Sequence, residues 1–316
     1  MAQQLNVSRV GPQRWKGIVM ETWQVGKVPS GGYITALLLK CITEELKAAS
    51  TEAPLPGQKR APNAHPDILT ANCHFLSSSL PGEFSATVEI LKSGRTTSTV
   101  QASLFQDGKE CMRCIASCGD YKTAAASGPN MVSLADTSNP PQLPPMSQCT
   151  RVQAGDNTPQ SVRSRVHLML PDSAYQQYLD CRSTNEDGTF DEELLLKRTE
   201  AVKGGRASYA GYCVFEDGTE PSLAAAPLYL DASVPPILGA YVTGWVPTIN
   251  WTVQFKGHPK PGPLKFQFDT STVNGGFLEE DGRLWDSEGT LIAMSRQLAM
   301  VGVSQSNKNR PATSKM

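Results

Sequence analysis

The chain has 316 residues, a formal net charge of -1, 39% hydrophobic residues and 19% charged residues. This length accommodates two domains of ordinary size, and the near-neutral balance without a basic block argues against a nucleic-acid-binding surface. The longest apolar runs fall far short of the roughly 18 residues of a membrane span, and the first residues lack a secretory layout, so we expect an intracellular protein with no membrane partner.

The eight cysteines follow no disulfide framework, and we expect reduced thiols. Three of them, Cys111, Cys114 and Cys118, are close in sequence, but no fourth ligand is near, so no metal is expected. The chain also lacks the G-x-S-x-G motif of serine hydrolases and the glycine-rich motifs of nucleotide-binding proteins. We therefore predict no cofactor.

The first part of the chain predicts strands around one helix. Residues 15–25 read as one or two strands, and residues 33–46 are apolar at helical spacing after the break at Pro29-Ser30-Gly31-Gly32. Turn signals then separate four extended segments, at residues 68–76, 83–91, 96–106 and 111–121.

The second part repeats this order after a segment rich in Pro, Ser and Asn at residues 123–160, which we interpret as a linker. A helix is predicted at residues 222–234. Extended segments are predicted at residues 162–170, 206–215, 248–255, 264–272, 276–286 and 290–303.

A constant numerical offset supports an internal repeat. Phe75 and Phe255 are 180 residues apart, and so are the turns Pro81-Gly82 and Pro261-Gly262. Gly94 and Gly275 are 181 residues apart, as are Gly108 and Gly289. The sequence therefore predicts two copies of one helix-plus-sheet unit.

One acid stands out in the predicted second helix. Asp231 follows an apolar run and precedes Pro235-Pro236, which should end the helix near Val234. A carboxylate in the last turn is disfavoured by the helix dipole, so Asp231 needs a partner or a role. A simply solvated acid at the start of a loop is the alternative that the residues leave open.

Two polar residues accompany Asp231 in the predicted strands that follow. Thr248 opens a strand in which we expect it to share a face with Asn250 and Thr252, opposite Trp251. Gln297 lies on a strand face of small residues, which leaves room for a ligand or a helix. A buried, satisfied amide at Gln297 and a strand-forming role for Thr248 remain alternatives.

Several motifs together resemble one family. PSGGYITALLLK, HPDILTANCHFLSSSLPGEF and KSGRTTSTVQASLFQDGKE resemble the first half of double hotdog acyl-CoA thioesterases of type II and their thioesterase-like relatives. LYLDASVPPIL, WVPTINWTVQF and LWDSEGTLIAMSRQLAMV are similar to the second half. The resemblance implies an α+β double hotdog, in which each unit is a long central helix wrapped by an antiparallel sheet. We expect hotdog units at 13–122 and 161–305, a linker at 123–160 and a flexible tail at 306–316.

The resemblance also implies a site and a reaction. Asp231, Thr248 and Gln297 match the three family residues that position an attacking water, which implies hydrolysis of acyl-CoA to free acid and CoA. From the residues themselves, backbone N–H groups at Gly31 and Gly32, where the first helix begins, are candidates to bind the oxyanion. A turn that needs glycine there is the alternative.

The repeat predicts a single site per chain. Ile68 corresponds to Thr248 and Ala116 to Gln297, and no acid between Ile34 and Thr43 matches Asp231. Only the second unit can therefore perform this chemistry, while we expect the first to contribute packing, the glycine turn and half the acyl pocket.

Other functions stay open alongside hydrolysis. A thioesterase-like protein could bind an acyl thioester without cleaving it, or serve a biosynthetic step, and hotdog proteins also include enoyl-CoA hydratases and dehydratases. Gly155-Asp156-Asn157 imitates the start of the hydratase motif, but no histidine follows until His167. We expect acyl-CoA as the partner, a role in lipid metabolism and a homo-oligomer. The ending Ser314-Lys315-Met316 is either a variant of the peroxisomal address Ser-Lys-Leu or an arbitrary tail of a cytoplasmic protein.

Overall fold

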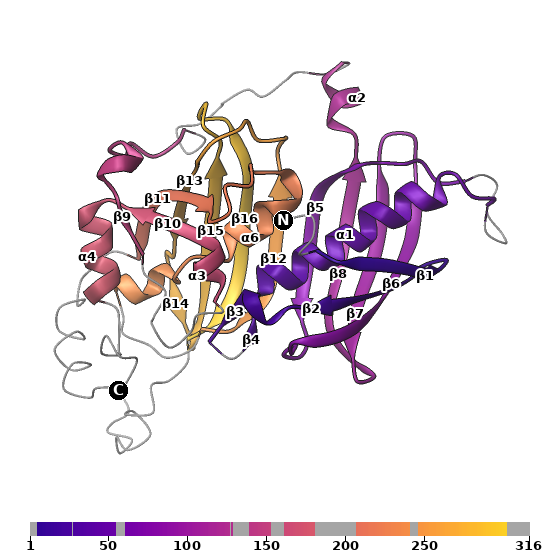
Figure 1. The fold of residues 1–316 in the computed structure, drawn as a ribbon, viewed down its shortest axis with the longest axis horizontal. Helices are drawn as coiled ribbons and strands as arrows, with labels where there is room; N and C mark the ends of the chain where they lie inside the picture. The colour runs from indigo at the N-terminus through magenta and orange to yellow at the C-terminus, as the bar shows by residue number, and fades with distance from the viewer. Residues whose placement is uncertain are drawn as a thin grey trace.

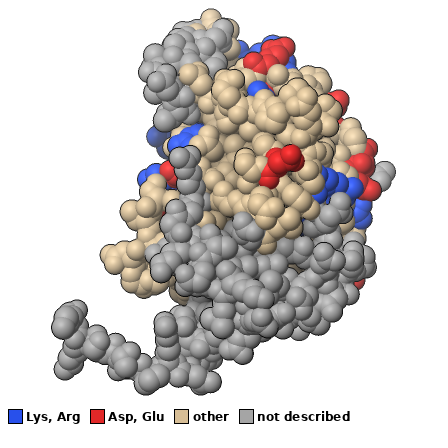
Figure 2. All heavy atoms as spheres, turned by 90° about the vertical axis from the view of Figure 1, so that its left-hand side faces the viewer, with Lys and Arg blue, Asp and Glu red and all other residues tan. Residues whose placement is uncertain are grey.

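The computed structural model describes residues 5–26, 28–54, 61–126, 128, 139–152, 161–180, 207–240 and 246–301. The predicted tail with Ser314-Lys315-Met316, the motif Gly155-Asp156-Asn157 and much of the predicted linker lie outside these residues. Within them, no helix is both long and apolar enough to cross a membrane. On one face of the molecule, the described charged residues of both signs are scattered among uncharged ones (Figure 2).

The strands form one 14-stranded antiparallel sheet in two halves (Figure 1). The first half has the order β1-β2-β6-β7-β8-β5, and its strands are β1 (Val7–Gly11), β2 (Arg14–Val19), β5 (Asp67–Phe75), β6 (Gly82–Ser93), β7 (Ser98–Gln106) and β8 (Lys109–Gly119). The second half has the order β12-β16-β15-β13-β11-β10-β9, with β14 paired to β15. Its strands are β9 (Thr150–Arg151), β10 (Val166–Leu170), β11 (Ser208–Phe215), β12 (Thr248–Phe255), β13 (Leu264–Asp269), β14 (Val273–Asn274), β15 (Phe277–Trp285) and β16 (Leu291–Met300). A separate pair consists of β3 (Gln24–Val25) and β4 (Val28–Pro29).

The two halves meet where β5 pairs with β12, and the pairing confirms the repeat. Asn72 lies opposite Thr252, 180 residues further on, so a residue pairs with its own repeat equivalent at this seam. The Thr252 hydroxyl donates to Asn72 Oδ1 at 3.0 Å. A pseudo-twofold axis therefore passes between these two residues. The same equivalence holds one strand further out, because Ala71 pairs with Ala116 as Trp251 pairs with Gln297.

Helix α1 (Gly31–Ala49) lies across the strands of the first half (Figure 1). Ser30 caps its start, because the Ser30 hydroxyl accepts a hydrogen bond from the Tyr33 N–H. Its apolar residues, among them Leu37, Leu38 and Ile42, are almost completely buried. The prediction of a helix at residues 33–46 is therefore confirmed, and the helix also includes Gly31 and Gly32 at its start and continues to Ala49.

The second central helix is shorter than predicted. A 3-10 turn (η4, Leu223–Ala225) leads into α6 (Ala226–Leu230), and the helix ends at Leu230 rather than near Val234. Helix α6 has only five residues, a proline lies at one of its first two positions, and no side chain caps its N-terminus. Pro235 and Pro236 then start a second 3-10 turn, η5 (Pro236–Gly239), which prevents the helix from continuing. The expectation of a long helix in both units is therefore wrong for the second.

Several short elements were not predicted, because their sequences carry little periodicity. They are the edge strand β1, η1 (Glu21–Trp23), α2 (Tyr121–Ala125), η3 (Met146–Gln148), α3 (Val162–Arg165) and α4 (Asp172–Asp180). Strand β9 falls in the predicted linker and extends the sheet beyond β10. Of these elements, η1 packs against α1, because the buried Trp23 ring stacks on Tyr33, and α3 contacts η1.

Candidate active site

Asp231 lies where the end of α6 meets the start of α1. Its Oδ2 atom accepts hydrogen bonds from the Ser30 hydroxyl at 2.6 Å and from the Gly32 N–H at 2.8 Å. The positive end of the 19-residue helix α1 thus offsets the unfavourable position of a carboxylate after α6. The partner that the sequence required for Asp231 comes from the other half of the chain.

Gly32 has to be glycine because α6 approaches α1 so closely. A Cβ atom at Gly32 would lie 2.2 Å from the Pro227 carbonyl oxygen and 2.6 Å from the Asp231 Cβ. Both contacts are far shorter than real Cβ contacts, and one involves backbone. Residue 32 therefore fixes the separation of the two helices and the depth at which the carboxylate lies.

Opposing effects act on the pKa of Asp231. Burial, the larger effect, raises it, because the charged form loses hydration. The hydrogen bonds from Gly32, Ser30 and Gly31 lower it, because they favour the carboxylate. The result is a pKa above the ordinary aspartate value, which makes Asp231 a stronger base than an exposed aspartate.

Thr248 and Gln297 are in direct contact across neighbouring strands. The Thr248 hydroxyl donates to Gln297 Oε1 at 2.5 Å. A bulge between Thr248 and Asn250 in the β12–β16 pairing makes this possible, since it sets Thr248 opposite Ala299 while Trp251 is opposite Gln297. Paired residues share a face, so Thr248 lies on the same face as Trp251 and Gln297. The expected alternation, with Thr248 opposite Trp251, is wrong for this reason.

Glu280 is a fourth polar residue of this region, which the sequence analysis did not identify. It lies on β15 directly opposite Gln297, and its side chain is buried. Burial and, to a smaller extent, the negative charge of Asp231 raise its pKa to about 8, although a hydrogen bond with Gln297 opposes the shift. One carboxyl oxygen, Oε2, has no hydrogen-bond partner. The signal was the alternation of β15, where Glu280 falls in register with the buried Leu278 and Leu284.

The four polar side chains form two groups joined by Glu280. Asp231 is bonded to the start of α1, and Thr248 is bonded to Gln297. Glu280 interacts with Gln297 by hydrogen bonding and with Asp231 electrostatically. Strand β15 passes directly beneath α6, since a Cβ atom at Gly282 would lie 3.1 Å from the Leu230 side chain. The acid, the hydroxyl and the amide identified from the sequence are thus brought into one region of the second unit, beside Gly31 and Gly32.

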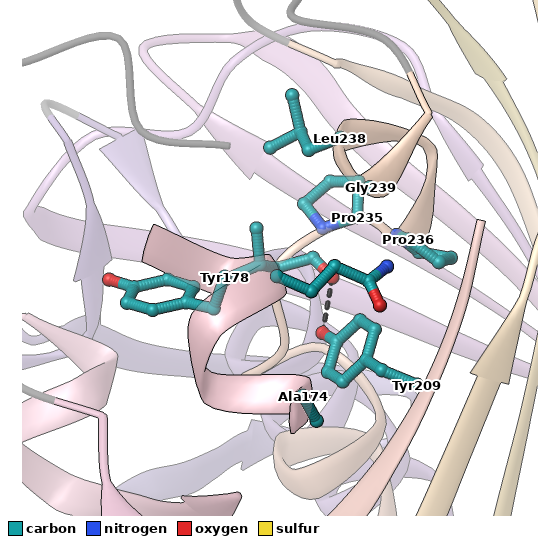
Figure 3. Close-up of a pocket in the computed structure, with 9 residues that line it drawn as sticks. Ala174, Tyr178, Tyr209, Pro235, Pro236, Leu238 and Gly239 are labelled. Carbon is teal, nitrogen blue, oxygen red and sulfur yellow. Dashed lines mark hydrogen bonds between the residues drawn. The ribbon is translucent and has the colours of Figure 1, made fainter. Parts of the chain in front are cut away.

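The segment that follows Asp231 is held against β11 and α4. The Tyr209 hydroxyl donates to the Val234 carbonyl oxygen (Figure 3). It also contacts the Ser233 hydroxyl. The pocket between Tyr209, Tyr178 and Pro235 has a volume of about 20 Å³, which is room for about one water molecule. This contact therefore anchors the end of α6 and leaves no space for a substrate.

Two antiparallel sheets joined edge to edge, each packed on a central helix, with a carboxylate between the helix ends, define a double hotdog protein of the thioesterase class. Residues 19–119 match the family described as Acyl-CoA thioesterase N-terminal domain, and residues 140–301 match the Acyl-CoA thioesterase C-terminal domain. The chain belongs to the acyl-CoA thioesterase family.

Solved structures share this fold, and curated sequence relatives match most of the chain. A protein from Thermobifida fusca provisionally named thioesterase II is 25% identical, with a TM-score of 0.73 over 95% of this chain and 97% of the other. An acyl-CoA thioesterase II, TesB2, from Mycobacterium marinum has the same fold, with a TM-score of 0.60 at 14% identity over 96% of this chain and 98% of the other. Uncharacterized proteins from Mycobacterium bovis and Mycobacterium tuberculosis are 24% identical over 91% of this chain and 90% of their own length.

Proposed function

We propose that this protein hydrolyses acyl-CoA thioesters to a free acid and CoA, with a water molecule held by Asp231, Thr248 and Gln297. The observation that carries the proposal is a difference between the repeats. Thr248, Glu280 and Gln297 occupy positions whose repeat equivalents are Ile68, Val100 and Ala116. Polar groups are costly to bury in a core, and three at apolar positions of the same scaffold support a chemical role.

The hydrogen bonds determine how a water would be held. Thr248 gives its proton to Gln297, so the Thr248 oxygen can only accept from a water. The Gln297 amide has two N–H groups, and one of them serves Glu280, which leaves the other to donate. A water between these groups and Asp231 would donate to Thr248 and to the carboxylate and accept from Gln297. Its free lone pair would then face the thioester carbon.

In the proposed reaction, the water oxygen forms a bond to the thioester carbon while its proton passes to Asp231. The C–S bond then breaks, and the CoA sulfur takes the proton back from Asp231. Glu280, with a pKa of about 8, is protonated at neutral pH and so keeps a second negative charge away from the developing oxyanion. This separates the roles of the two acids: Asp231 acts as base, and Glu280 positions Gln297.

Gly31 and Gly32 are the proposed oxyanion donors. In this structure, the Gly32 N–H donates to Asp231 Oδ2. A thioester oxygen could take this donor only in exchange for the carboxylate, which would free Asp231 to receive the proton of the water. We therefore propose that substrate binding and activation of the base are linked through the start of α1.

Release of free CoA thiol from a panel of saturated and enoyl acyl-CoAs tests the proposed function. We expect thiol release from at least one chain length. Loss of enoyl absorbance without thiol release would instead identify a hydratase, the runner-up among the enzymes. Binding without turnover on every member of the panel would identify a thioesterase-like binding protein and contradict hydrolysis.

The remaining predictions concern assembly and location. A homo-oligomer is supported by apolar side chains that are exposed on the outer face of the joined sheets, namely Ile115, Leu298 and Met300, which are 42%, 43% and 42% exposed. Size-exclusion chromatography with light scattering tests the homo-oligomer, and a monomer at micromolar concentration would contradict this prediction.

The unit limits 13–122 and 161–305 and the role of Ser314-Lys315-Met316 stay predictions. A fluorescent protein carrying the last ten residues tests the peroxisomal address.

A further inference from the structure

The pseudo-twofold axis relates the candidate active site to a second place in the molecule. Along the strands, the 180-residue offset carries Thr248 to Ile68 and Phe75 to Phe255. Along the helices, Ser30 and Ser222 both precede the first helical residue, so the start of α1 corresponds to Leu223 and Ala224. With that alignment, Leu39 takes the place of Asp231.

That second place is an open cavity of about 380 Å³. Its walls include Leu39, Ile68, Leu223 and Ala224, which are the repeat equivalents of Asp231, Thr248, Gly31 and Gly32, together with Phe255. The volume lies within the roughly 300 to 1,000 Å³ that is typical of small-molecule sites. The first unit thus keeps the space of an active site without the acid, hydroxyl and amide that would make it catalytic.

The chemistry of this cavity fits an aliphatic chain with an anionic end. At the positions equivalent to those that would hold water in the candidate active site, this cavity has apolar side chains, and apolar side chains favour contact with a hydrocarbon chain. At the rim, Lys47 is exposed and forms no ion pair among the described residues, and Lys40 is bonded to Glu44 at 2.7 Å.

The acids of the cavity are already engaged. Asp67 accepts from the Tyr121 N–H at 2.8 Å and contacts His258 Nε2 at 2.9 Å. Glu44 is paired with Lys40. Lys47 is therefore the cation at the rim that is available to pair with a negatively charged ligand. The two paired acids repel such a ligand less than free carboxylates would.

We propose that this cavity is a second, non-catalytic binding site for a long-chain aliphatic carboxylate, with the chain against Leu39, Ile68 and Phe255 and the carboxylate at Lys47. The binding claim does not depend on hydrolysis at Asp231. If hydrolysis does occur, a fatty acid that it releases belongs to the class of ligand that this cavity accepts. The first unit then becomes a sensor for the kind of product that the second unit makes.

Calorimetric titration with dodecanoate tests the proposal on the full-length chain. The blocking variant is Ala224→Trp, since Ala224 is an exposed residue of the cavity wall, and Ala224→Ser is its matched control. We expect Ala224→Trp to lose one binding event per chain relative to wild type and Ala224→Ser to keep it. CoA release under saturating substrate should be the same in all three proteins.

A second pair of variants tests the recognition of charge. Lys47→Glu should weaken dodecanoate binding about fivefold or more, because it replaces attraction by repulsion at the rim. Lys16→Glu, an exposed lysine on β2, should leave binding unchanged. Dodecan-1-ol, which has the same chain and no charge, should bind more weakly than dodecanoate to wild type.

Four results would overturn the proposal. Unchanged stoichiometry and affinity in Ala224→Trp would show that dodecanoate binds elsewhere. Equal binding of dodecanol and dodecanoate, or no effect of Lys47→Glu, would remove the recognition of the carboxylate. Loss of CoA release together with dodecanoate binding in Ala224→Trp would make the cavity part of the substrate path rather than a separate site. Failure of hydrolysis in wild type would leave the binding claim standing.

Discussion

The two halves of the molecule share one backbone plan and differ in what they bury at four equivalent positions. The first half has Leu39, Ile68, Val100 and Ala116 where the second has Asp231, Thr248, Glu280 and Gln297. Leu39 and Ile68 of the apolar set line an open cavity, whereas the polar set is joined by hydrogen bonds and by the electrostatic interaction of Asp231 with Glu280. The comparison teaches that one scaffold can carry either a binding cavity or a reaction site, and that a few side chains decide which.

The largest expected effect comes from Gly32→Ala, which attacks the contact between the halves. The added Cβ would lie 2.2 Å from the Pro227 carbonyl oxygen, so α6 and Asp231 must move. A displacement of about 1 Å costs roughly 100-fold in rate, and we expect at least that loss in kcat/KM for CoA release.

Gly31→Ala is the matched control for Gly32→Ala. Its new Cβ would meet the Phe75 ring at 3.0 Å, and a side chain can yield where backbone cannot. We expect a smaller loss in Gly31→Ala. Wild-type activity in Gly32→Ala would refute the fixed helix separation, and it would remove the contrast with Ala224, which stands at the equivalent helix start in the second half.

The next prediction is a loss of stability, and it distinguishes a structural acid of the first half from the candidate active-site acids of the second half. Glu45 is buried at the end of α1, where it accepts from the Arg9 guanidinium at 2.8 Å and from the Trp15 indole N–H at 2.8 Å. Removing one partner of a buried ion pair costs about 3 kcal/mol or more. Glu45→Ala should therefore lower the free energy of unfolding by about 3 kcal/mol in urea titrations.

The rate of CoA release distinguishes this loss of stability from the effect of a substitution at the active site. Folded Glu45→Ala should release CoA at the wild-type rate, because Glu45 lies at the opposite end of α1 from Gly32. Glu44→Ala, whose carboxylate is half-exposed and paired with Lys40, is the control and should change stability by less than about 1 kcal/mol. A rate defect in folded Glu45→Ala would contradict the division of roles between the halves.

A tenfold effect is expected at Thr248. Thr248→Val removes the hydroxyl that donates to Gln297 Oε1 and leaves the size of the side chain unchanged. The amide then loses one of its two fixed contacts, and the loss of a hydrogen bond of about 1.4 kcal/mol corresponds to tenfold in kcat. Thr248→Ser should restore most of the activity. Thr252→Val, which removes the hydroxyl bonded to Asn72 at the seam, should leave kcat unchanged, and an equal loss in both variants would point to general strand damage.

The last effect is on the pH dependence of stability, and it arises from Glu280. The pKa of this buried acid is about 8 in the folded chain against 4.5 for an ordinary glutamate. The folded state therefore keeps a proton that the unfolded state releases, so stability contributed by Glu280 is lost as pH rises from 4.5 to about 8. Glu280→Gln cannot ionise, so its free energy of unfolding should fall less over this range.

Glu279→Gln is the control on the same strand. Burial raises the pKa of Glu279, but hydrogen bonds from Thr272 and Ser271 outweigh it and lower the pKa below 4.5, so the stability from Glu279 is lost only in more acidic solution and Glu279→Gln should keep the wild-type slope above pH 5. Urea unfolding from pH 5 to pH 9 compares the two variants with wild type. Identical slopes in wild type and Glu280→Gln would show that Glu280 is not held protonated by the fold.

The sequence predicted the repeat and the region of the site because both depend on patterns that survive in one dimension. The offset of 180 residues between Phe75 and Phe255 reappears as the pairing of Asn72 with Thr252 at the seam. Asp231 stood out because a carboxylate after an apolar helix needs a partner. That partner, at Ser30 and Gly32, was not predictable from local sequence, because it is about 200 residues away along the chain and meets Asp231 only through helix packing.

Other features depend on packing that sequence patterns do not contain. The bulge after Thr248 moves the Thr248 side chain to the other face of the strand. The alternation of polar and apolar residues along the strand does not reveal this bulge. Glu280 has a partial signal in its register with Leu278 and Leu284, but its raised pKa results from burial and from Asp231 on another element. The cavity of the first half is the space left between α1, η4 and the seam, which only the assembled chain defines.

The most direct test of the account is the rate of CoA release by Asp231→Asn compared with wild type on one saturating acyl-CoA. The amide keeps the size of the side chain and can still accept from Ser30 and Gly32, but it cannot take a proton from water. General base catalysis contributes roughly 100- to 10,000-fold, so we predict a fall in kcat of at least 100-fold with thermal stability close to wild type. If Asp231→Asn hydrolyses acyl-CoA at a rate within about threefold of wild type, the claim that the polar set of the second half is the reaction site is contradicted.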